Sequence, residues 1–286
     1  MKDNKISRRL MIAMLAGTIV LSVAMAGCGN SSENTSRSSV SSSSAESQNN
    51  DNDNSDNDSN DTEESSTDDT ESEDDSDTVD EFSGICGESV TWVLNENGEL
   101  VISGTGGISD FKSFLDIPWY KHGENIKTVV IEDGVTSICE YAFNGLSNVT
   151  SITIPNSVNV IGDAAFFMCD RLSSITLPDG ITSIGDQTFG NCLDLTSIII
   201  PDSVTSIGKW AFGGCGNLSE VNIPDGVTSI GDRAFFSCSL SDVTIPESVT
   251  SIGEQAFDVR GVTIHGKSGS CAETYAQERG IPFSAE

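Results

Sequence analysis

Hydrophobic residues return at fixed intervals between residues 126 and 261, and this periodicity organises the chain. The aliphatic residue that begins each unit recurs every 23 residues from Val149 to Leu218, and then after 22 residues at Leu240. A fixed period of this length is typical of a solenoid, in which each coil packs only against its neighbours. The pattern therefore predicts six stacked coils over residues 126–261.

The unit Leu195–Asn217 shows what each coil does. Ile198 and Ile200 alternate with a period of two, so both point to one face of a strand. Pro201 has no amide hydrogen to donate and ends that strand. We expect a short helical turn to carry Phe212 back to the interior. Stacking the coils then predicts a parallel sheet along one side and a column of phenylalanines along the other.

The repeated text LxxIxIPxxVTSIGxxAFxxC resembles the BspA-like, or Treponema-type, leucine-rich repeat family. The resemblance covers all six units and implies an α/β fold dominated by β-structure. It implies a right-handed leucine-rich-repeat solenoid of parallel strands with short helical turns, capped at both ends. Members of this family are associated with surface adhesion, so the resemblance also implies a binding role.

Both flanks of the repeats are similar to caps of the same family. Residues 83–125 contain VTWVL and ELVIS around an Asn-Glu-Asn-Gly turn, which predicts a β-hairpin. Residues 262–286 contain SCAETYAQERG, which predicts one short helix between two strand-like pieces. Exposed solenoid ends need such covers for solubility.

Residues 1–28 form a secretory signal by their composition, with Lys2, Lys5, Arg8 and Arg9 before an apolar run. The run ends in Met-Ala-Gly-Cys, which resembles the lipobox of a bacterial lipoprotein. By that resemblance Cys28 becomes the lipidated first residue, on the extracytoplasmic face of the cell membrane. An ordinary secretory signal is the alternative, and Arg8-Arg9 leaves the twin-arginine export route open beside the general one.

Residues 29–82 are almost free of large apolar side chains and hold 18 acidic residues against Arg37. Such a segment cannot bury enough surface to offset its ordering entropy, so we expect a disordered acidic stalk. Within it, Asp53 to Glu64 approach the spacing of an EF-hand loop, but Asp58 stands where the loop requires glycine. We therefore expect only loose, nonspecific cation binding in this segment. No metal site and no cofactor are expected elsewhere, since the cysteines show no zinc-ligand spacing and no glycine loop is placed to bind phosphate.

Charge narrows the choice of partners. Residues 83–286 hold 25 acidic and 9 basic residues. Binding to nucleic acid needs clusters of Lys and Arg, so nucleic acid is excluded as a partner. Contact with anionic lipid is disfavoured for the same reason, which leaves the lipid anchor as the only expected link to the membrane.

Cysteines occupy one repeat position in four successive coils, at Cys169, Cys192, Cys215 and Cys238. Export permits disulfides, but parallel neighbours meet the torsion of a disulfide poorly, which favours buried free thiols. His265 and Cys271 share the C-terminal cap, yet no oxyanion donors or orienting carboxylate accompany them. We therefore predict a protein that is not an enzyme.

Two surfaces are candidates for binding. The first is the outward face of the predicted sheet, a row of mostly small polar side chains with a slightly apolar stripe. The second holds large residues at variable repeat positions, which are enriched in interfaces but also shield turns. The candidate residues are Val130, Thr153, Thr176, Ile199, Asn222 and Thr244 on the sheet face, and Phe167, Trp210 and Phe236 on the other.

Two hypotheses about function remain. In the first, the protein is displayed at the cell surface and binds another protein or a host glycoprotein in an adhesion-type contact. In the second, it is a structural envelope or cell-wall component without a foreign ligand. The partner and the oligomeric state stay open.

Overall fold

The computed structural model describes residues 82–286. The predicted signal sequence, Cys28, the predicted acidic stalk up to residue 81 and the EF-hand-like spacing lie outside the described residues. The six coils are numbered here by their residues: 126–148, 149–171, 172–194, 195–217, 218–239 and 240–261.

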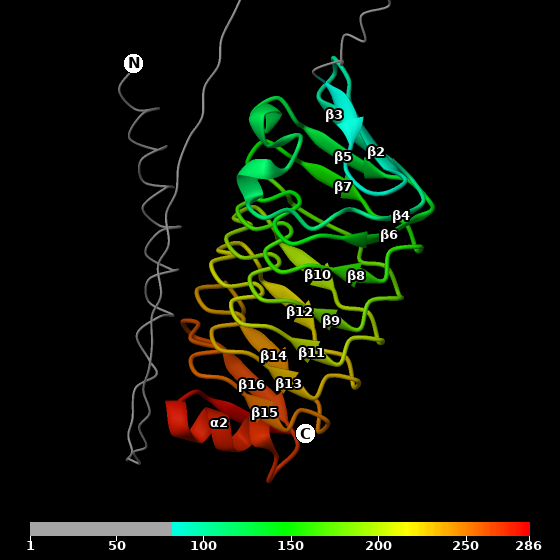
Figure 1. The fold of residues 1–286 in the computed structure, drawn as a ribbon. Helices are drawn as coiled ribbons and strands as arrows, with labels where there is room; N and C mark the ends of the chain where they lie inside the picture. Colours follow the sequence, from blue (N-terminus) through cyan, green and yellow to red (C-terminus); the bar gives the residue numbers. More distant parts are fainter. Residues whose placement is uncertain (1–81) are drawn as a thin grey trace, which may run out of the picture. The chain divides into compact units, whose positions relative to one another are not determined.

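The solenoid carries two rows of parallel strands, called ladders below, where the sequence predicted one (Figure 1). Each ladder is divided into separately hydrogen-bonded sheets, three in the first and two in the second. The I-x-I segments form the first ladder, and coil 3 joins it through a single bridge from Thr176 to Ile199. The V-T-S-I segments, which follow the proline turn, form the second. The first ladder contains β5 (Thr128–Ile131), β7 (Ser151–Thr153), β10 (Ser197–Ile199), β12 (Glu220–Asn222), β14 (Asp242–Thr244) and β16 (Thr263–Gly266). The second contains β6 (Val135–Ile138), β8 (Val160–Ile161), β9 (Ser183–Ile184), β11 (Ser206–Ile207), β13 (Ser229–Ile230) and β15 (Ser251–Ile252).

The third section of each coil, which follows the second strand, differs from the expected helical turn. Residues such as Lys209–Gly214 form hydrogen-bonded turns, and no helix lies in the six coils. Trp210 adopts a positive φ of 54° and Gly214 one of 81°, and left-handed residues of this kind interrupt a helix. The amide groups of Trp210, Phe212 and Gly214 donate to carbonyls of coil 5 at 2.8–2.9 Å. This section is therefore a third ladder between coils.

Phenylalanine rings fill the interior beside this third ladder, as the sequence predicted. The rings of Phe143, Phe166, Phe189, Phe212, Phe235 and Phe257 are fully buried and stack with centroids 5.1–5.8 Å apart. Aliphatic residues from the two strand ladders fill the rest of one continuous core. Fully burying one such side chain contributes on the order of 2 kcal/mol, so each coil depends on the next for its stability.

The N-terminal cap adds antiparallel strands to the first ladder. β2 (Val90–Leu94) and β3 (Glu99–Gly104) form the hairpin, β1 (Ser83–Ile85) pairs with β2, and β3 pairs in parallel with β5. β4 (Gly106–Gly107) starts the second ladder by pairing with β6. Two 3₁₀ turns, η1 (Phe114–Asp116) and η2 (Tyr120–His122), bracket Trp119, which stacks on Phe143 at 5.7 Å.

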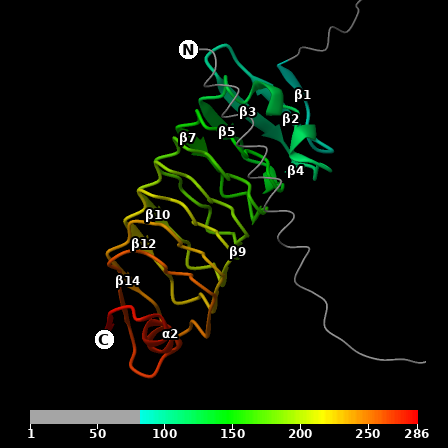
Figure 2. The same cartoon turned by 90° about the vertical axis from the view of Figure 1, so that its left-hand side faces the viewer.

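The C-terminal cap closes the other end of the stack (Figure 2). β16 and β17 (Phe283–Ala285) extend the first ladder, with α2 (Cys271–Arg279) between them. Ser270 caps the N-terminus of α2, and Gly280 ends it in the left-handed conformation. α2 places the ring of Tyr275 against Phe257, at a centroid distance of 6.1 Å.

Candidate binding surfaces

The structure places the sheet-face candidates on the first ladder, where strand pairing joins them in three groups. Val130 pairs with Thr153, Thr176 with Ile199, and Ile199 with Asn222, while Thr244 pairs with His265 of the cap. Thr153, Thr176, Asn222 and Thr244 are exposed, Val130 is half-buried, and Ile199 is 79% exposed. Because strand pairing uses the backbone groups, these side chains are what the face offers to a partner. The face is polar with one large apolar side chain at its centre.

The aromatic candidates lie on the third ladder, away from the sheet face. Phe167, Trp210 and Phe236 are half-buried. The Trp210 and Phe236 rings meet edge to face with centroids 5.3 Å apart, and the Arg233 guanidinium lies 5.3 Å from the Trp210 centroid. The candidates therefore define two separate surfaces, which the structure does not bring together.

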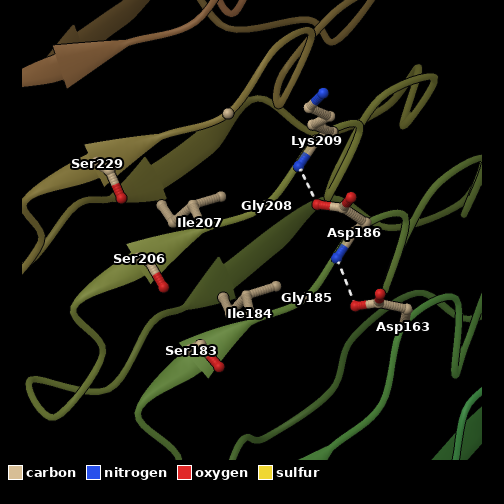
Figure 3. Close-up of a pocket in the computed structure, with 11 residues that line it drawn as sticks. Asp163, Ser183, Ile184, Gly185, Asp186, Ser206, Ile207, Gly208, Lys209 and Ser229 are labelled. Carbon is tan, nitrogen blue, oxygen red and sulfur yellow. Dashed lines mark hydrogen bonds between the residues drawn. The ribbon is translucent and has the colours of Figure 1, made fainter. Parts of the chain in front are cut away.

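A groove along the second strand ladder was missed by the sequence reasoning. It has a volume of about 420 Å³ and is lined by residues of coils 2 to 5 (Figure 3). Ser183, Ser206 and Ser229 occupy paired positions of β9, β11 and β13, so their hydroxyls form a row with one group per coil. The recurring text T-S-I-G is the signal that could have predicted this row.

The serine and threonine hydroxyls of this ladder have different roles. The hydroxyls of Thr205 and Thr228 each donate to the carbonyl of the equivalent threonine in the preceding coil, at 3.1 Å. Within the described part of the chain, the hydroxyls of Ser183, Ser206 and Ser229 have no such partner. The threonines therefore support the ladder, whereas the serines leave donors and acceptors at the surface.

Carboxylates line the edge of the same groove. Oδ1 of Asp163 accepts the amide of Asp186 at 2.8 Å, and Oδ1 of Asp186 accepts the amide of Lys209 at 2.7 Å (Figure 3). Lys209 also reaches Oδ2 of Asp232 at 3.5 Å. These aspartates follow the repeat glycine and hold the next coil by its backbone, so their first role is structural.

The cysteine column consists of buried free thiols. Each Sγ donates to the carbonyl of a phenylalanine in the preceding coil, as in the 3.0 Å contact from Cys215 to Phe189. Burial raises the pKa of Cys86 and of Cys139 to about 12, and it also raises the pKa of Cys169, Cys192 and Cys238. Thiols held protonated in this way are poor nucleophiles and poor metal ligands.

His265 and Cys271 do not form a nucleophile and base. Nε2 of His265 lies 3.0 Å from Oδ1 of Asp242 on the first ladder. This hydrogen bond lowers the pKa of the exposed Asp242 carboxyl. Burial raises the pKa of the Cys271 thiol, which disfavours the thiolate. Cys271 is therefore a packing cysteine, and His265 takes part in a separate surface hydrogen bond with Asp242.

Neither a metal-binding cluster nor a membrane-spanning helix lies within residues 82–286. No group of three or more His, Cys, Asp or Glu side chains in this range is placed to hold a metal ion. No helix in this range has the length and apolar character needed to cross a membrane.

Together, the parallel ladders, the buried phenylalanine column and the exposed strand face define a leucine-rich-repeat scaffold. The family model described as "BspA type Leucine rich repeat region (6 copies)" matches residues 119–195 and 182–263, half of the chain. The chain belongs to this family, which confirms the resemblance and the solenoid fold. No curated protein matches the chain.

Solved bacterial leucine-rich-repeat structures are similar to parts of the chain. A leucine rich cell surface protein from Faecalibacterium prausnitzii is 29% identical with a TM-score of 0.49, over 63% of this chain and 53% of that one. A leucine rich repeat protein from T. pallidum is 23% identical with a TM-score of 0.43, over 69% and 96%. One from Eubacterium ventriosum is 23% identical with a TM-score of 0.36, over 65% and 72%.

Proposed function

We propose that this chain is a lipid-anchored binding protein displayed on the outer side of a bacterial membrane. Its repeats engage another protein, such as a host glycoprotein, in an adhesion-type contact. Family membership supports a scaffold of repeats that presents surface rather than one that carries out chemistry. The protonated thiols and the His265–Asp242 pair support a non-enzymatic role.

The observation that carries this proposal is the row of outward side chains on the first ladder. Its backbone groups are used in strand pairing, and Ile199, exposed to 79%, stands among small polar residues. A large apolar side chain surrounded by polar ones is the arrangement of an interface core with its rim. An extended row of this kind suits a partner that lies along the solenoid.

The membrane-anchoring part of the proposal rests on the sequence that precedes the solenoid. Cys28 follows small residues at the end of an apolar run, and the 18 acidic residues between positions 29 and 82 form a spacer. A charged spacer of this composition separates the binding face from the membrane surface. Display at the surface and the lipid on Cys28 are both parts of the proposal.

Protease digestion of intact cells tests display, with release into the medium as the second measurement. For the unchanged chain we expect the repeats to be cleaved on intact cells and to remain cell-bound without protease. Cys28→Ala should release the protein, whereas Cys271→Ala, which removes a cysteine of the C-terminal cap, should leave it attached. Repeats that are protected on intact cells and cleaved only after wall removal would instead favour the structural envelope role.

A further inference from the structure

The repeat loses one residue at a defined place, between Cys238 and Leu240. Two residues separate the corresponding Cys215 and Leu218, but only Ser239 separates Cys238 and Leu240. Coil 6 also breaks the pattern, because Arg260 stands where coils 2 to 5 have the buried cysteine. Departures from an otherwise regular repeat are places where function is expected to override packing.

A cavity of about 550 Å³ lies at this break, between the third sections of coils 5 and 6. Phe236, Ser237, Asp258 and Arg260 contribute to its lining. The groove of Figure 3 is separate from it, since that groove follows the second strand ladder. The cavity is therefore a local feature of the irregular coils.

The polar groups of the cavity are available to a ligand. Arg260 is exposed, and its guanidinium has no hydrogen bond or ion pair within residues 82–286. The Asp258 carboxylate accepts one long hydrogen bond, from Gln255 to Oδ2 at 3.4 Å. A guanidinium offers a planar set of donors and a carboxylate a planar set of acceptors, so the cavity presents both.

Neighbouring side chains support Phe236, the aromatic residue that lines the cavity. The rings of Phe236 and Trp210 meet edge to face at a centroid distance of 5.3 Å. Trp210 lies directly over Gly213, where a Cβ atom would come within 2.4 Å of the indole. Arg233 covers Trp210 and donates from Nε to Gln255 at 2.7 Å. Such a supported ring loses little freedom on binding.

We propose that this cavity binds a pyranose unit of an uncharged glycan. A pyranose presents an apolar face of C–H groups and a rim of hydroxyls that both donate and accept. Phe236 would pack against the C–H face, Arg260 would donate to ring or hydroxyl oxygens, and Asp258 would accept from hydroxyls. This inference rests on the proposed function, because it names glycan as what the displayed protein recognises on a glycoprotein.

Charge favours an uncharged sugar over an acidic one. Asp258 lines the cavity beside Arg260, and acidic residues outnumber basic ones by 25 to 9 in residues 83–286. An anionic ligand would meet this negative field as well as the carboxylate. An apolar peptide side chain would bury the Arg260 guanidinium without a partner and would leave the Asp258 carboxylate with only its long hydrogen bond from Gln255, which is unfavourable.

Tryptophan fluorescence and saturation-transfer NMR of the full-length chain test the inference. The sugars are lactose, maltotriose, mannotriose and chitotriose, with sialyllactose as the anionic comparison. Trp92 and Trp119 are buried in the N-terminal cap, so Trp210 beside Phe236 is the fluorophore that a ligand here perturbs. We expect a saturable change with at least one uncharged sugar, and binding weakened about tenfold or more in Arg260→Ala.

Matched variants define the outcome. Arg171→Ala removes an exposed arginine of coil 2 and should leave sugar affinity unchanged, whereas Asp258→Asn should weaken it. Absence of saturable binding to all uncharged sugars overturns the inference, as does binding of sialyllactose alone or equal affinity in Arg260→Ala. Binding is measured on purified protein and display on cells, so failure of one proposal is distinguishable from failure of the other.

Discussion

The hydroxyl oxygen of Tyr275 accepts a hydrogen bond from the backbone amide of Phe257 at 3.0 Å. In earlier coils the equivalent amides donate to a carbonyl of the next coil, as Phe235 does to Ala256 at 2.8 Å. At the first coil it is a carbonyl group that needs a donor, and Nε1 of Trp119 donates to the carbonyl of Ala142 at 2.8 Å. Trp119 thus extends the phenylalanine stack and Tyr275 closes it edge to face, and both satisfy the open ends of the third ladder.

Replacing Tyr275 by Phe should lower the free energy of unfolding by about 1–2 kcal/mol, because a buried amide then loses its acceptor. The ring and its contact with Phe257 remain, so the loss reports the hydroxyl alone. Denaturant unfolding of both proteins measures the difference. Tyr120→Phe is the control, since its exposed hydroxyl has no hydrogen-bond partner within residues 82–286. Equal losses in the two variants would contradict the capping role.

The repeat glycine allows two backbones to approach closely. A Cβ at Gly208 would lie 2.6 Å from the backbone nitrogen of Asp186 and 2.6 Å from the carbonyl carbon of Gly185. Gly208→Ala should therefore lower the free energy of unfolding by about 2–3 kcal/mol through overpacking. Gly216→Ala is the matched control, because nothing lies within 4 Å of its added Cβ. Thermal or urea unfolding should leave this control within about 0.5 kcal/mol of the parent, and a tolerated Gly208→Ala would refute the close-approach argument.

Much of this fold was predictable because equivalent positions recur in six successive coils. The Ile198 and Ile200 alternation identified the first ladder, and the recurring Phe212 position identified the buried stack. The third ladder was predicted wrongly as helical. Its left-handed residues are Trp210, Arg233 and their equivalents, which carry no sequence signal for that conformation, since glycine is the usual residue there.

The candidate site was less predictable for a different reason. The pairing of Thr176 with Ile199 and of Ile199 with Asn222 follows directly from the 23-residue register. The exposed serine row could not be predicted, because the sequence does not show which hydroxyls bond to a neighbouring coil. The structure shows that Thr205 and Thr228 form these bonds and the serines do not. The one-residue loss after Cys238 is visible in the amino-acid sequence. The cavity beside Phe236 depends on how the side chains of coil 6 pack against coil 5.

The thiols of the column should resist alkylation in the folded protein. Cys215 and Cys238 are buried and donate to backbone carbonyls, whereas Cys271 is half-buried. Among cysteines of residues 82–286, iodoacetamide should therefore modify Cys271 first, with mapping by peptide mass spectrometry. The same reaction in denaturant, where every thiol is accessible, provides the reference rate. Column peptides that are modified as fast as Cys271, or recovered as disulfides, would contradict the buried-thiol assignment.

Stability should fall steeply at alkaline pH, because burial raises the pKa of several thiols in the folded state. Cys86 and Cys139 have their pKa raised to about 12, against an ordinary value of 9.0. Between these values the unfolded chain loses protons that the folded chain retains. The contribution of each thiol to the free energy of unfolding is therefore fully present below pH 9. It decreases by about 1.4 kcal/mol per pH unit and per thiol as pH rises towards 12.

Urea unfolding between pH 8 and pH 11 measures this slope, and Cys139→Ala isolates one thiol. Cys139 occupies the repeat-glycine position of coil 1, so alanine retains the Cβ while removing the titrating group. The variant should lose stability near pH 8 through its cavity, yet show a shallower decline above pH 9. Cys271→Ala should keep a slope closer to that of the parent, because the half-buried Cys271 has its pKa raised less than Cys139 does. Parallel declines in the parent and Cys139→Ala would show that the Cys139 thiol does not titrate as its burial requires.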